Sequence, residues 1–276
     1  MDWIQAIVLG IVQGLSEFLP ISSSAHVSIV GQLFFGGRDP GAAFTAIIQL
    51  GTETAVVIYF WRDIVKIIGH WAKSLVGKLP RDDPHARMGW LVIIGSIPIV
   101  VLGLLFKDQI EGTLRNLWLT AIMLGGFAIV LGIVDRFARN RRTLEQLTWK
   151  HGLLFGLAQS LALVPGVSRS GGTIAGGLLM GYKREEAARY SFLLAIPAVF
   201  GSGFFQLYDE LSTGASPAVG WGPTILATVI AFVIGIAVIH WLLRYISTHD
   251  FLPFVIYRLV LAAGLVALLA TGVLAP

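Results

Sequence analysis

The sequence contains no cysteine and little charge, and both absences narrow what the protein can be. Without cysteine there is no disulfide, no thiolate nucleophile and no cysteine-ligated metal. Asp, Glu, Lys and Arg make up 13% of the chain, against roughly 25% in ordinary soluble domains. With so little polar surface, we expect no nucleic-acid partner. The chain also lacks a Walker loop and an HExxH motif, which excludes familiar routes to ATP hydrolysis and zinc proteolysis.

Hydrophobic residues make up 55% of the 276 residues, and the mean hydropathy is +0.78. A helix that crosses a bilayer needs about 20 residues. Six apolar stretches have a suitable length, namely 42–61, 90–106, 117–134, 186–208, 223–243 and 253–274. The N-terminus lacks the basic leader of a signal peptide, so we expect the first apolar stretch to belong to the folded protein. The pattern predicts an all-α polytopic membrane protein.

Two further apolar stretches, 3–35 and 151–180, are each interrupted by Pro, Ser and Gly. Their second limbs, 25–35 and 171–180, are too short to cross a bilayer. Irregular backbone at membrane depth is tolerated only where protein or a wet cavity covers it. We therefore predict two broken re-entrant helical hairpins in addition to the six full spans.

The basic residues predict the orientation of the chain. Fifteen of the 20 fall on one predicted side, in 62–87, 136–150 and 183–189 and at Arg244. Three fall on the other side, namely Arg38, Lys107 and Arg115. By the positive-inside rule the first side is cytoplasmic and both termini lie outside. The first hairpin then enters from outside and the second from the cytoplasm.

The chain also shows signs of an internal duplication at an offset of 146 residues. Gln13 corresponds to Gln159, and Ser22 corresponds to Ser168. Because the basic residues give the halves opposite orientations, we predict an inverted-topology repeat of two five-segment halves, 1–140 and 141–276. In such folds the broken segments meet near the bilayer midplane. The re-entrant motifs, 13–26 and 159–173, should therefore face each other.

These two motifs carry polar residues that are costly at membrane depth and thus indicate function. Arg169 lies in a glycine-rich break before a short helix, where a phosphate could bind. Glu17 could share a divalent cation with that phosphate, or orient His26. The alternative is a purely structural role, in which Glu17 and Arg169 form an ion pair that only joins the hairpins. A second structural guess pairs Glu53 with Arg258.

His26 follows three serines and could act as general acid or base, or attack phosphorus itself. The serine hydroxyls could supply a nucleophile and phosphate donors, or only cap the return helix. A transporter is the main alternative to an enzyme, because inverted repeats with broken helices are common in transporters. Glu17 and His26 would then form a proton relay.

The motifs QGLSEFLPISSSAH at Gln13 and PGVSRSG at Pro165 are accompanied by FTAIIQLG, SFLLAIPA and FLPFVIYR. Together they resemble the undecaprenyl-diphosphate phosphatases of bacteria, also called the bacitracin-resistance family. The resemblance spans essentially the whole chain. It implies a multi-pass enzyme of the bacterial cytoplasmic (inner) membrane that hydrolyses undecaprenyl diphosphate to undecaprenyl phosphate. This hydrolysis recycles the lipid carrier for peptidoglycan synthesis and gives bacitracin resistance.

The resemblance also implies roles for individual residues. The catalytic residues that it implies are Ser23, His26, Glu17 and Arg169. Ser23 is favoured as the nucleophile and His26 as its base. Substrate binding is expected at Gln13, Ser22, Ser24, Ser168, Ser170 and Gly171, and Mg²⁺ or Ca²⁺ is expected at Glu17. Many members have Glu where this chain has Gln13, and Gly where it has Ala25. The sequence leaves open attack by His26 itself and formation of a homodimer. It also leaves open a transporter or flippase of a polyprenyl phosphate as the alternative to the phosphatase.

The acid-phosphatase type of lipid phosphatase is a poorer match to the motifs. That family uses two histidines, and no histidine follows Arg169 at a short spacing. We therefore favour the bacitracin-resistance family over it.

Overall fold

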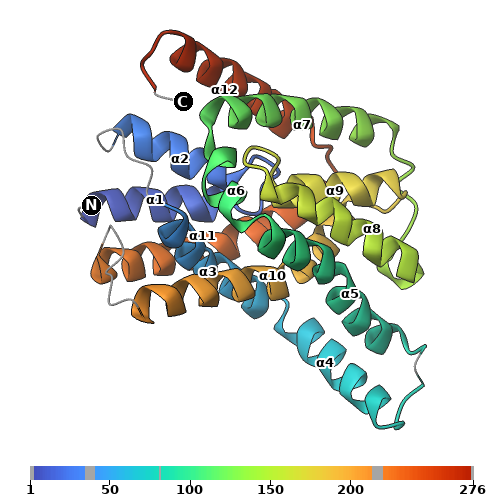
Figure 1. Ribbon diagram of the computed structural model, residues 1–276. Coiled ribbons are helices and arrows are strands. Elements are labelled where there is room, and N and C mark those ends of the chain that lie inside the picture. The colour runs from blue at the N-terminus through green and yellow to red at the C-terminus, as the bar shows by residue number, and fades with distance from the viewer. Residues whose placement is uncertain (1–2, 35–40, 81, 213–219, 275–276) are drawn as a thin grey trace.

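The computed structural model describes residues 3–34, 41–80, 82–212 and 220–274, and Figure 1 shows these ranges as helices joined by short connections. Within them, one isolated bridge between Arg142 and Tyr182 is the only strand-like pairing. The end of the predicted stretch 3–35 and two basic residues used for orientation, Arg38 and Arg81, lie outside the described residues. The predicted all-α class is confirmed for the described ranges.

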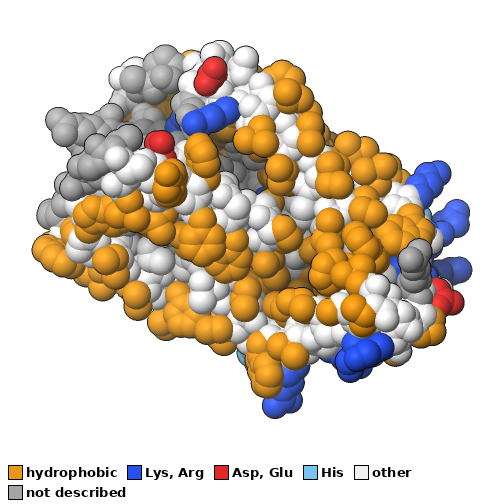
Figure 2. Space-filling model, turned by 60° about the horizontal axis from the view of Figure 1, so that its bottom comes forward, with side chains coloured by type: hydrophobic (Ala, Val, Ile, Leu, Met, Phe, Trp, Pro, Cys, Tyr) orange, Lys and Arg blue, Asp and Glu red, His pale blue; other side chains and the backbone are white. Residues whose placement is uncertain are grey.

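Five helices in the described residues are long and apolar enough to cross a membrane: α5 (Pro84–Leu105), α7 (Leu117–Phe137), α10 (Arg184–Ser212), α11 (Trp221–Ile246) and α12 (Leu252–Ala270). They confirm a polytopic membrane protein, and Figure 2 shows hydrophobic side chains spread over much of the face in view. The sixth predicted span is α3 (Ala42–Tyr59), which passes the same test only together with the helix that follows it.

That following helix, α4 (Trp61–Leu75), bends away from α3 by 78° and was not expected from the sequence. Ile64 and Ile67 of α4 pack against the core, whereas Arg62 and Lys66 are exposed. A helix with one apolar and one charged face is stable at a boundary between hydrocarbon and water. The basic segment 62–87 therefore begins with an amphipathic helix.

Both predicted broken hairpins are present. The first consists of α1 (Trp3–Ser16) and α2 (Ser23–Phe34), and the second of α8 (Trp149–Ser160) and α9 (Arg169–Leu179). The residue before each return helix has a left-handed backbone, with φ of 73° at Ser22 and 74° at Ser168. Few residues other than glycine adopt this conformation. The chain therefore reverses by the same unusual turn in both hairpins.

The hairpins pack against spanning helices through closely approaching backbones. α1 lies on α11 and α8 lies on α5, while α3 packs on α10 and α7 on α12. A Cβ atom at Gly10 would come within 2.7 Å of the Ala227 carbonyl oxygen, and one at Gly156 within 2.2 Å of the Gly95 carbonyl oxygen. Small residues allow such contacts between membrane helices. Figure 1 shows the two hairpins entering the molecule from different sides.

Arg258 of α12 holds the two hairpin breaks together. Its side chain is fully buried, and its Nη1 atom donates to the carbonyl oxygens of Pro20 (3.0 Å) and Val167 (3.1 Å). Nη2 donates to the Gly166 carbonyl (2.8 Å), and Nε donates to the Leu124 carbonyl on α7 (3.1 Å). One guanidinium thus satisfies carbonyls from the first break, the second break and a spanning helix.

Candidate active site

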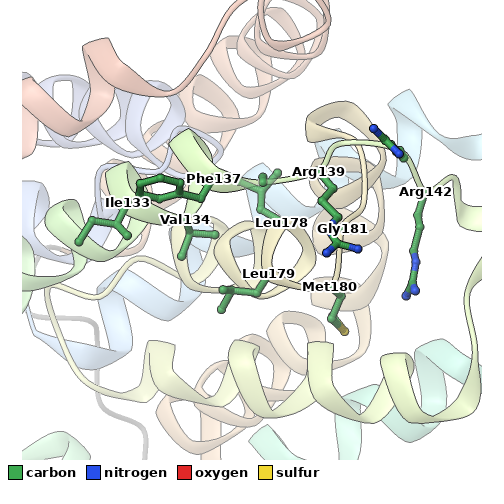
Figure 3. A pocket seen from close by; sticks show the side chains of 11 residues that line it. Ile133, Val134, Phe137, Arg139, Arg142, Leu178, Leu179, Met180 and Gly181 are labelled. Carbon is green, nitrogen blue, oxygen red and sulfur yellow. The ribbon is translucent and has the colours of Figure 1, made fainter.

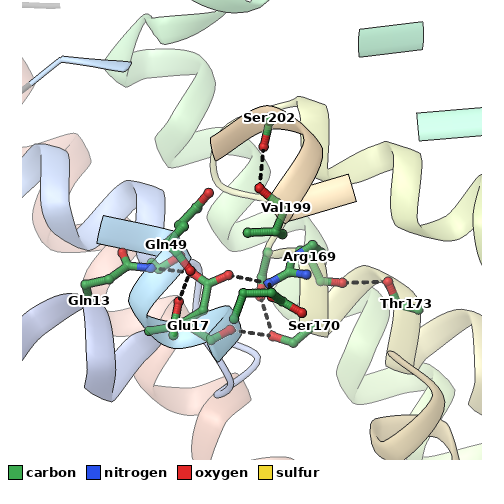
Figure 4. A network of polar contacts seen from close by, with 12 residues as sticks. Gln13, Glu17, Gln49, Arg169, Ser170, Thr173, Val199 and Ser202 are labelled. Carbon is green, nitrogen blue, oxygen red and sulfur yellow. Dashed lines mark hydrogen bonds and ion pairs between the residues drawn. The ribbon is translucent and has the colours of Figure 1, made fainter. Parts of the chain in front are cut away.

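The two polar motifs meet inside the molecule, as their predicted positions in the repeat require. The Ser170 hydroxyl donates to the Leu19 carbonyl oxygen at 3.0 Å. Arg169 Nη2 forms an ion pair with Glu17 Oε1 at 2.6 Å. Figure 4 shows Glu17 and Arg169 pointing toward each other from the two hairpins. The predicted meeting of the motifs is confirmed.

Glu17 is the centre of this cluster. Its side chain is 2% exposed, and its Oε2 atom accepts hydrogen bonds from Gln13 Nε2 (2.8 Å) and Ser23 Oγ (2.5 Å). Its other oxygen accepts from Arg169. The ion pair considered above as a structural alternative is therefore present, but the same carboxylate also accepts a hydrogen bond from the Ser23 hydroxyl.

Glu53 also belongs to this site, although the sequence analysis paired it with Arg258. Its side chain is fully buried, and its Oε2 atom lies 3.4 Å from Arg169 Nη2. The predicted pairing of Glu53 with Arg258 is wrong, because Arg258 binds only backbone carbonyls in the contacts described above. The one available signal was a carboxylate inside an apolar stretch, which indicates function by default. Glu17, Glu53 and Arg169 together carry a net charge of −1 when all are ionised.

Three buried polar atoms of this cluster have no hydrogen-bond partner: Arg169 Nη1, Glu53 Oε1 and Gln13 Oε1. Buried polar groups are nearly always paired, so such atoms call for an explanation. The first is a donor suited to an anion. The other two are oxygen acceptors, and Mg²⁺ and Ca²⁺ prefer oxygen ligands from carboxylates and amides. The unpartnered atoms are therefore of the kinds that would bind a divalent cation and a phosphate.

His26 does not contact Ser23 through either ring nitrogen. Nδ1 lies 2.7 Å from the Ser22 carbonyl oxygen and must be the donor, because a carbonyl only accepts. Nε2 lies 2.7 Å from the hydroxyl of Tyr257, and the two rings are stacked. The structure brings Ser23 to Glu17 instead. Tyr257 was missed in the sequence, although it lies within FLPFVIYR.

The remaining predicted substrate-binding residues are mostly engaged within the protein. The hydroxyls of Ser168 and Ser170 lie 3.2 Å apart, and the Gly171 N–H donates to Ser168 Oγ at 3.1 Å. Ser22 and Ser24 repeat the first contact at 3.3 Å. This geometry favours helix capping for Ser168. Ser24 is exposed and helps to line a small cavity of about 40 Å³.

Comparison with known proteins agrees with the motifs. A family model described as bacitracin resistance protein BacA matches residues 6–264. A protein of Kineococcus radiotolerans named undecaprenyl-diphosphatase is 65% identical over 99% of this chain and 96% of its own length. A protein of Pseudarthrobacter chlorophenolicus with the same name is 61% identical over 99% of both chains.

A more distant relative gives the same result. A protein of Agrobacterium fabrum named undecaprenyl-diphosphatase 2 is 58% identical over 99% of this chain and 98% of its own length. The identity thus extends over the entire membrane fold, including both broken hairpins. The resemblance predicted from the two motifs is confirmed, and the chain belongs to the bacitracin resistance protein BacA family.

Proposed function

We propose that the protein is an undecaprenyl-diphosphatase of the bacterial cytoplasmic membrane. It hydrolyses undecaprenyl diphosphate to undecaprenyl phosphate and inorganic phosphate, which recycles the lipid carrier for cell-wall synthesis and gives bacitracin resistance. The names of full-length relatives at 58% to 65% identity support this activity. They favour hydrolysis over the transporter alternative.

The structural observation that best supports phosphate binding is the unpartnered N–H group of Arg169. Arg169 Nη1 is buried without a partner, while Nη2 of the same guanidinium is held by Glu17 and Glu53. The free N–H group can bind a phosphate oxygen beside the Ser23 hydroxyl. Ser23 and Arg169 each begin a helix, and unsatisfied backbone N–H groups at helix starts favour anions.

The contact between Ser23 and Glu17 supports a reaction in which Ser23 is the nucleophile. Its Oγ atom attacks the terminal phosphorus in line, and the bond from that phosphorus to the bridging oxygen breaks. Undecaprenyl phosphate leaves, and the hydroxyl proton passes to Glu17 Oε2, which already accepts it in a hydrogen bond. Water then attacks the phosphorus of the phosphoserine and the bond from phosphorus to Ser23 Oγ breaks. The proton held by Glu17 returns to Oγ, and phosphate leaves with both protons of the water. Positioning and charge stabilisation supply most of the catalysis in reactions of this type.

His26 has a different role in this mechanism from the one that the sequence suggested. Its ring is fixed by the Ser22 carbonyl and the Tyr257 hydroxyl, so it positions the turn that presents Ser23. Glu17 replaces it as the group that receives the proton.

Mg²⁺ or Ca²⁺ would be held by Glu17, Glu53 and the side-chain oxygen of Gln13. When bound, the cation would supply positive charge against the diphosphate. The family resemblance implies that many members have a glutamate where this chain has Gln13. In this chain Glu53 would provide the second carboxylate. The negative charge of the cluster and its two unpartnered oxygens support this assignment.

We also propose that the fold is an inverted-topology repeat with halves 1–140 and 141–276. The equivalent turns at Ser22 and Ser168 support it. So does the packing of α1 on α11, which matches that of α8 on α5. The pair α3 and α4, with the bend between them, would count as the sixth span. In this arrangement the phosphate site lies at the junction of the halves, near the bilayer midplane.

The direct test is phosphate release by purified protein in detergent from a C15 or C55 prenyl diphosphate, with and without EDTA. We expect release that EDTA abolishes and that Arg169→Ala reduces below about a hundredth, since such a residue stabilises the transferring phosphoryl group. Arg244→Ala is the matched control, because it removes an exposed arginine of α11. Binding of substrate without any release would contradict the proposal.

A further inference from the structure

A second cavity lies between the C-terminal ends of α7 and α9, and Figure 3 shows the side chains around it. Its volume is about 480 Å³. Apolar side chains form one part of its wall, mainly Ile133, Phe137 and Leu179, and the other part carries Arg139, Arg141 and Arg142. We call this cavity the arginine pocket. None of the described residues that line it is acidic.

The backbone around the arginine pocket is firmly tied. The N–H groups of Arg141 and Arg142 both donate to the Gly181 carbonyl oxygen, at 3.0 and 2.9 Å. In return, the Lys183 N–H donates to the Arg142 carbonyl at 3.0 Å. The arginines therefore project from a segment that is fixed to the start of α10, and the pocket is part of the fold.

The rim of the arginine pocket combines exposed apolar and basic side chains. Phe137 is 79% exposed, Leu179 is 72% exposed and Ile133 is 55% exposed. Large apolar surfaces of a membrane protein are stable when lipid chains cover them, and basic side chains extend from the same level toward the headgroups. The pocket thus lies where hydrocarbon meets headgroups, on the side that the basic residues mark as cytoplasmic.

The guanidinium groups in the arginine pocket are available to a ligand. Arg139 and Arg141 make no side-chain hydrogen bond or ion pair with the described residues. Arg142 Nη1 lies 3.0 Å from His151 Nε2, which holds its side chain at one end of the pocket. Positive charge beside an apolar wall is complementary to a phosphate that carries a hydrocarbon chain.

We propose that the arginine pocket binds an anionic glycerophospholipid of the cytoplasmic leaflet. The phosphodiester lies between Arg139 and Arg141, and an acyl chain covers Phe137 and Leu179. This lipid is distinct from the substrate of the active site. α9 begins at Arg169 and ends at Leu179, so the lipid contacts the end of the helix whose start carries the phosphate-binding arginine. Bound lipid therefore stabilises the second hairpin.

The test uses delipidated full-length protein in detergent and measures thermal unfolding during titration with one lipid at a time. The probes are phosphatidylglycerol, zwitterionic phosphatidylcholine and farnesyl phosphate. The test variant is Arg139→Gln/Arg141→Gln. The matched control is Lys73→Gln/Lys78→Gln, which removes the same charge from exposed positions in and just after α4.

We expect phosphatidylglycerol to raise the unfolding temperature of the unchanged protein more than phosphatidylcholine does. In the test variant the apparent phosphatidylglycerol affinity should fall about tenfold or more, since each basic residue near a lipid surface contributes about 1 kcal/mol. Leu179→Asn should weaken the response independently of charge. Phosphate release from a short prenyl diphosphate should persist in all of these variants, which shows that they fold.

Three results would overturn the proposal. An equal loss in the lysine control would mean that the affinity comes from diffuse surface charge. An equal response to phosphatidylcholine would remove the role of the anion. Displacement of phosphatidylglycerol by equimolar farnesyl phosphate would identify the occupant as a prenyl phosphate instead of a bilayer lipid. Because phosphate release is measured separately, failure here is distinguishable from failure of the proposed enzymatic activity.

Discussion

Ser23 and His26 occupy neighbouring turns of one short helix, but they face different partners. Ser23 donates to Glu17, whereas His26 bonds to Ser22 and Tyr257. A residue that touches the reacting atoms and a residue that supports the turn should respond differently to substitution. The difference gives a test of the mechanism at the scale of single side chains.

Ser23→Ala should leave less than about a hundredth of the phosphate release, because it removes the nucleophile. His26→Gln should retain at least about ten times more activity than Ser23→Ala, since an amide can keep a hydrogen bond to the Ser22 carbonyl. Initial rates with a short prenyl diphosphate measure both, and Ser28→Ala on the same helix is the control. Equal losses for Ser23→Ala and His26→Gln would return His26 to the role of base.

Glu53 gives a second prediction for a single residue. Glu53→Gln should raise the Mg²⁺ concentration for half-maximal activity about tenfold or more. The reason is that replacing a metal ligand, or a residue that hydrogen-bonds to one, lowers metal affinity on that scale. The measurement is a Mg²⁺ titration of phosphate release, together with calorimetric Mg²⁺ binding without substrate. Glu145→Gln, at an exposed position, controls for the lost charge. An unchanged Mg²⁺ requirement would remove Glu53 from the cation site.

At the scale of helices, two buried charged residues connect elements that are distant in sequence. Arg258 connects α12 to both hairpin breaks. Asp135 at the end of α7 pairs with Arg184 Nε at 2.6 Å and accepts from the Phe251 N–H at 2.8 Å. It thus connects α7 to the starts of α10 and α12. Each residue should matter more for assembly than for chemistry.

Arg258→Lys should destabilise the protein and reduce activity, although it keeps the charge. An ammonium group cannot reproduce the fork that reaches four carbonyl oxygens, and each buried polar group left unpaired costs about 1 to 3 kcal/mol. Thermal unfolding in detergent measures the loss, and Arg244→Lys at the end of α11 is the control. A variant as stable as the control would show that the breaks hold together without Arg258.

Asp135→Ala should lower the free energy of unfolding by about 1 to 3 kcal/mol, because it leaves the buried Phe251 N–H and the partly exposed Arg184 guanidinium without their acceptor. Asp63→Ala is the matched control, because its pair with Arg189 is exposed on both sides, and such pairs contribute about 0 to 1 kcal/mol. Thermal or urea unfolding compares the two variants. Similar losses at both positions would mean that burial does not distinguish the pairs.

For the molecule as a whole, features that depend on local patterns were predictable from the sequence. Apolar length located the spanning helices, and interruptions by Pro, Ser and Gly located the two breaks. The cluster around Glu17 was predictable in outline because both motifs are local. Glu53 and Tyr257 were assigned wrongly or missed because they join the site from α3 and α12, and the rotation of a helix between its neighbours is set by packing.

The arrangement around Arg258 has a consequence for how the protein is made. The break that includes Pro20 enters the membrane early in synthesis, but the arginine that binds the Pro20 carbonyl follows it by 238 residues. Until α12 is inserted, the carbonyls of both breaks lack this donor. The phosphate site therefore matures at the end of translation, and a ribosome-bound chain that stops before α12 should be inserted yet inactive.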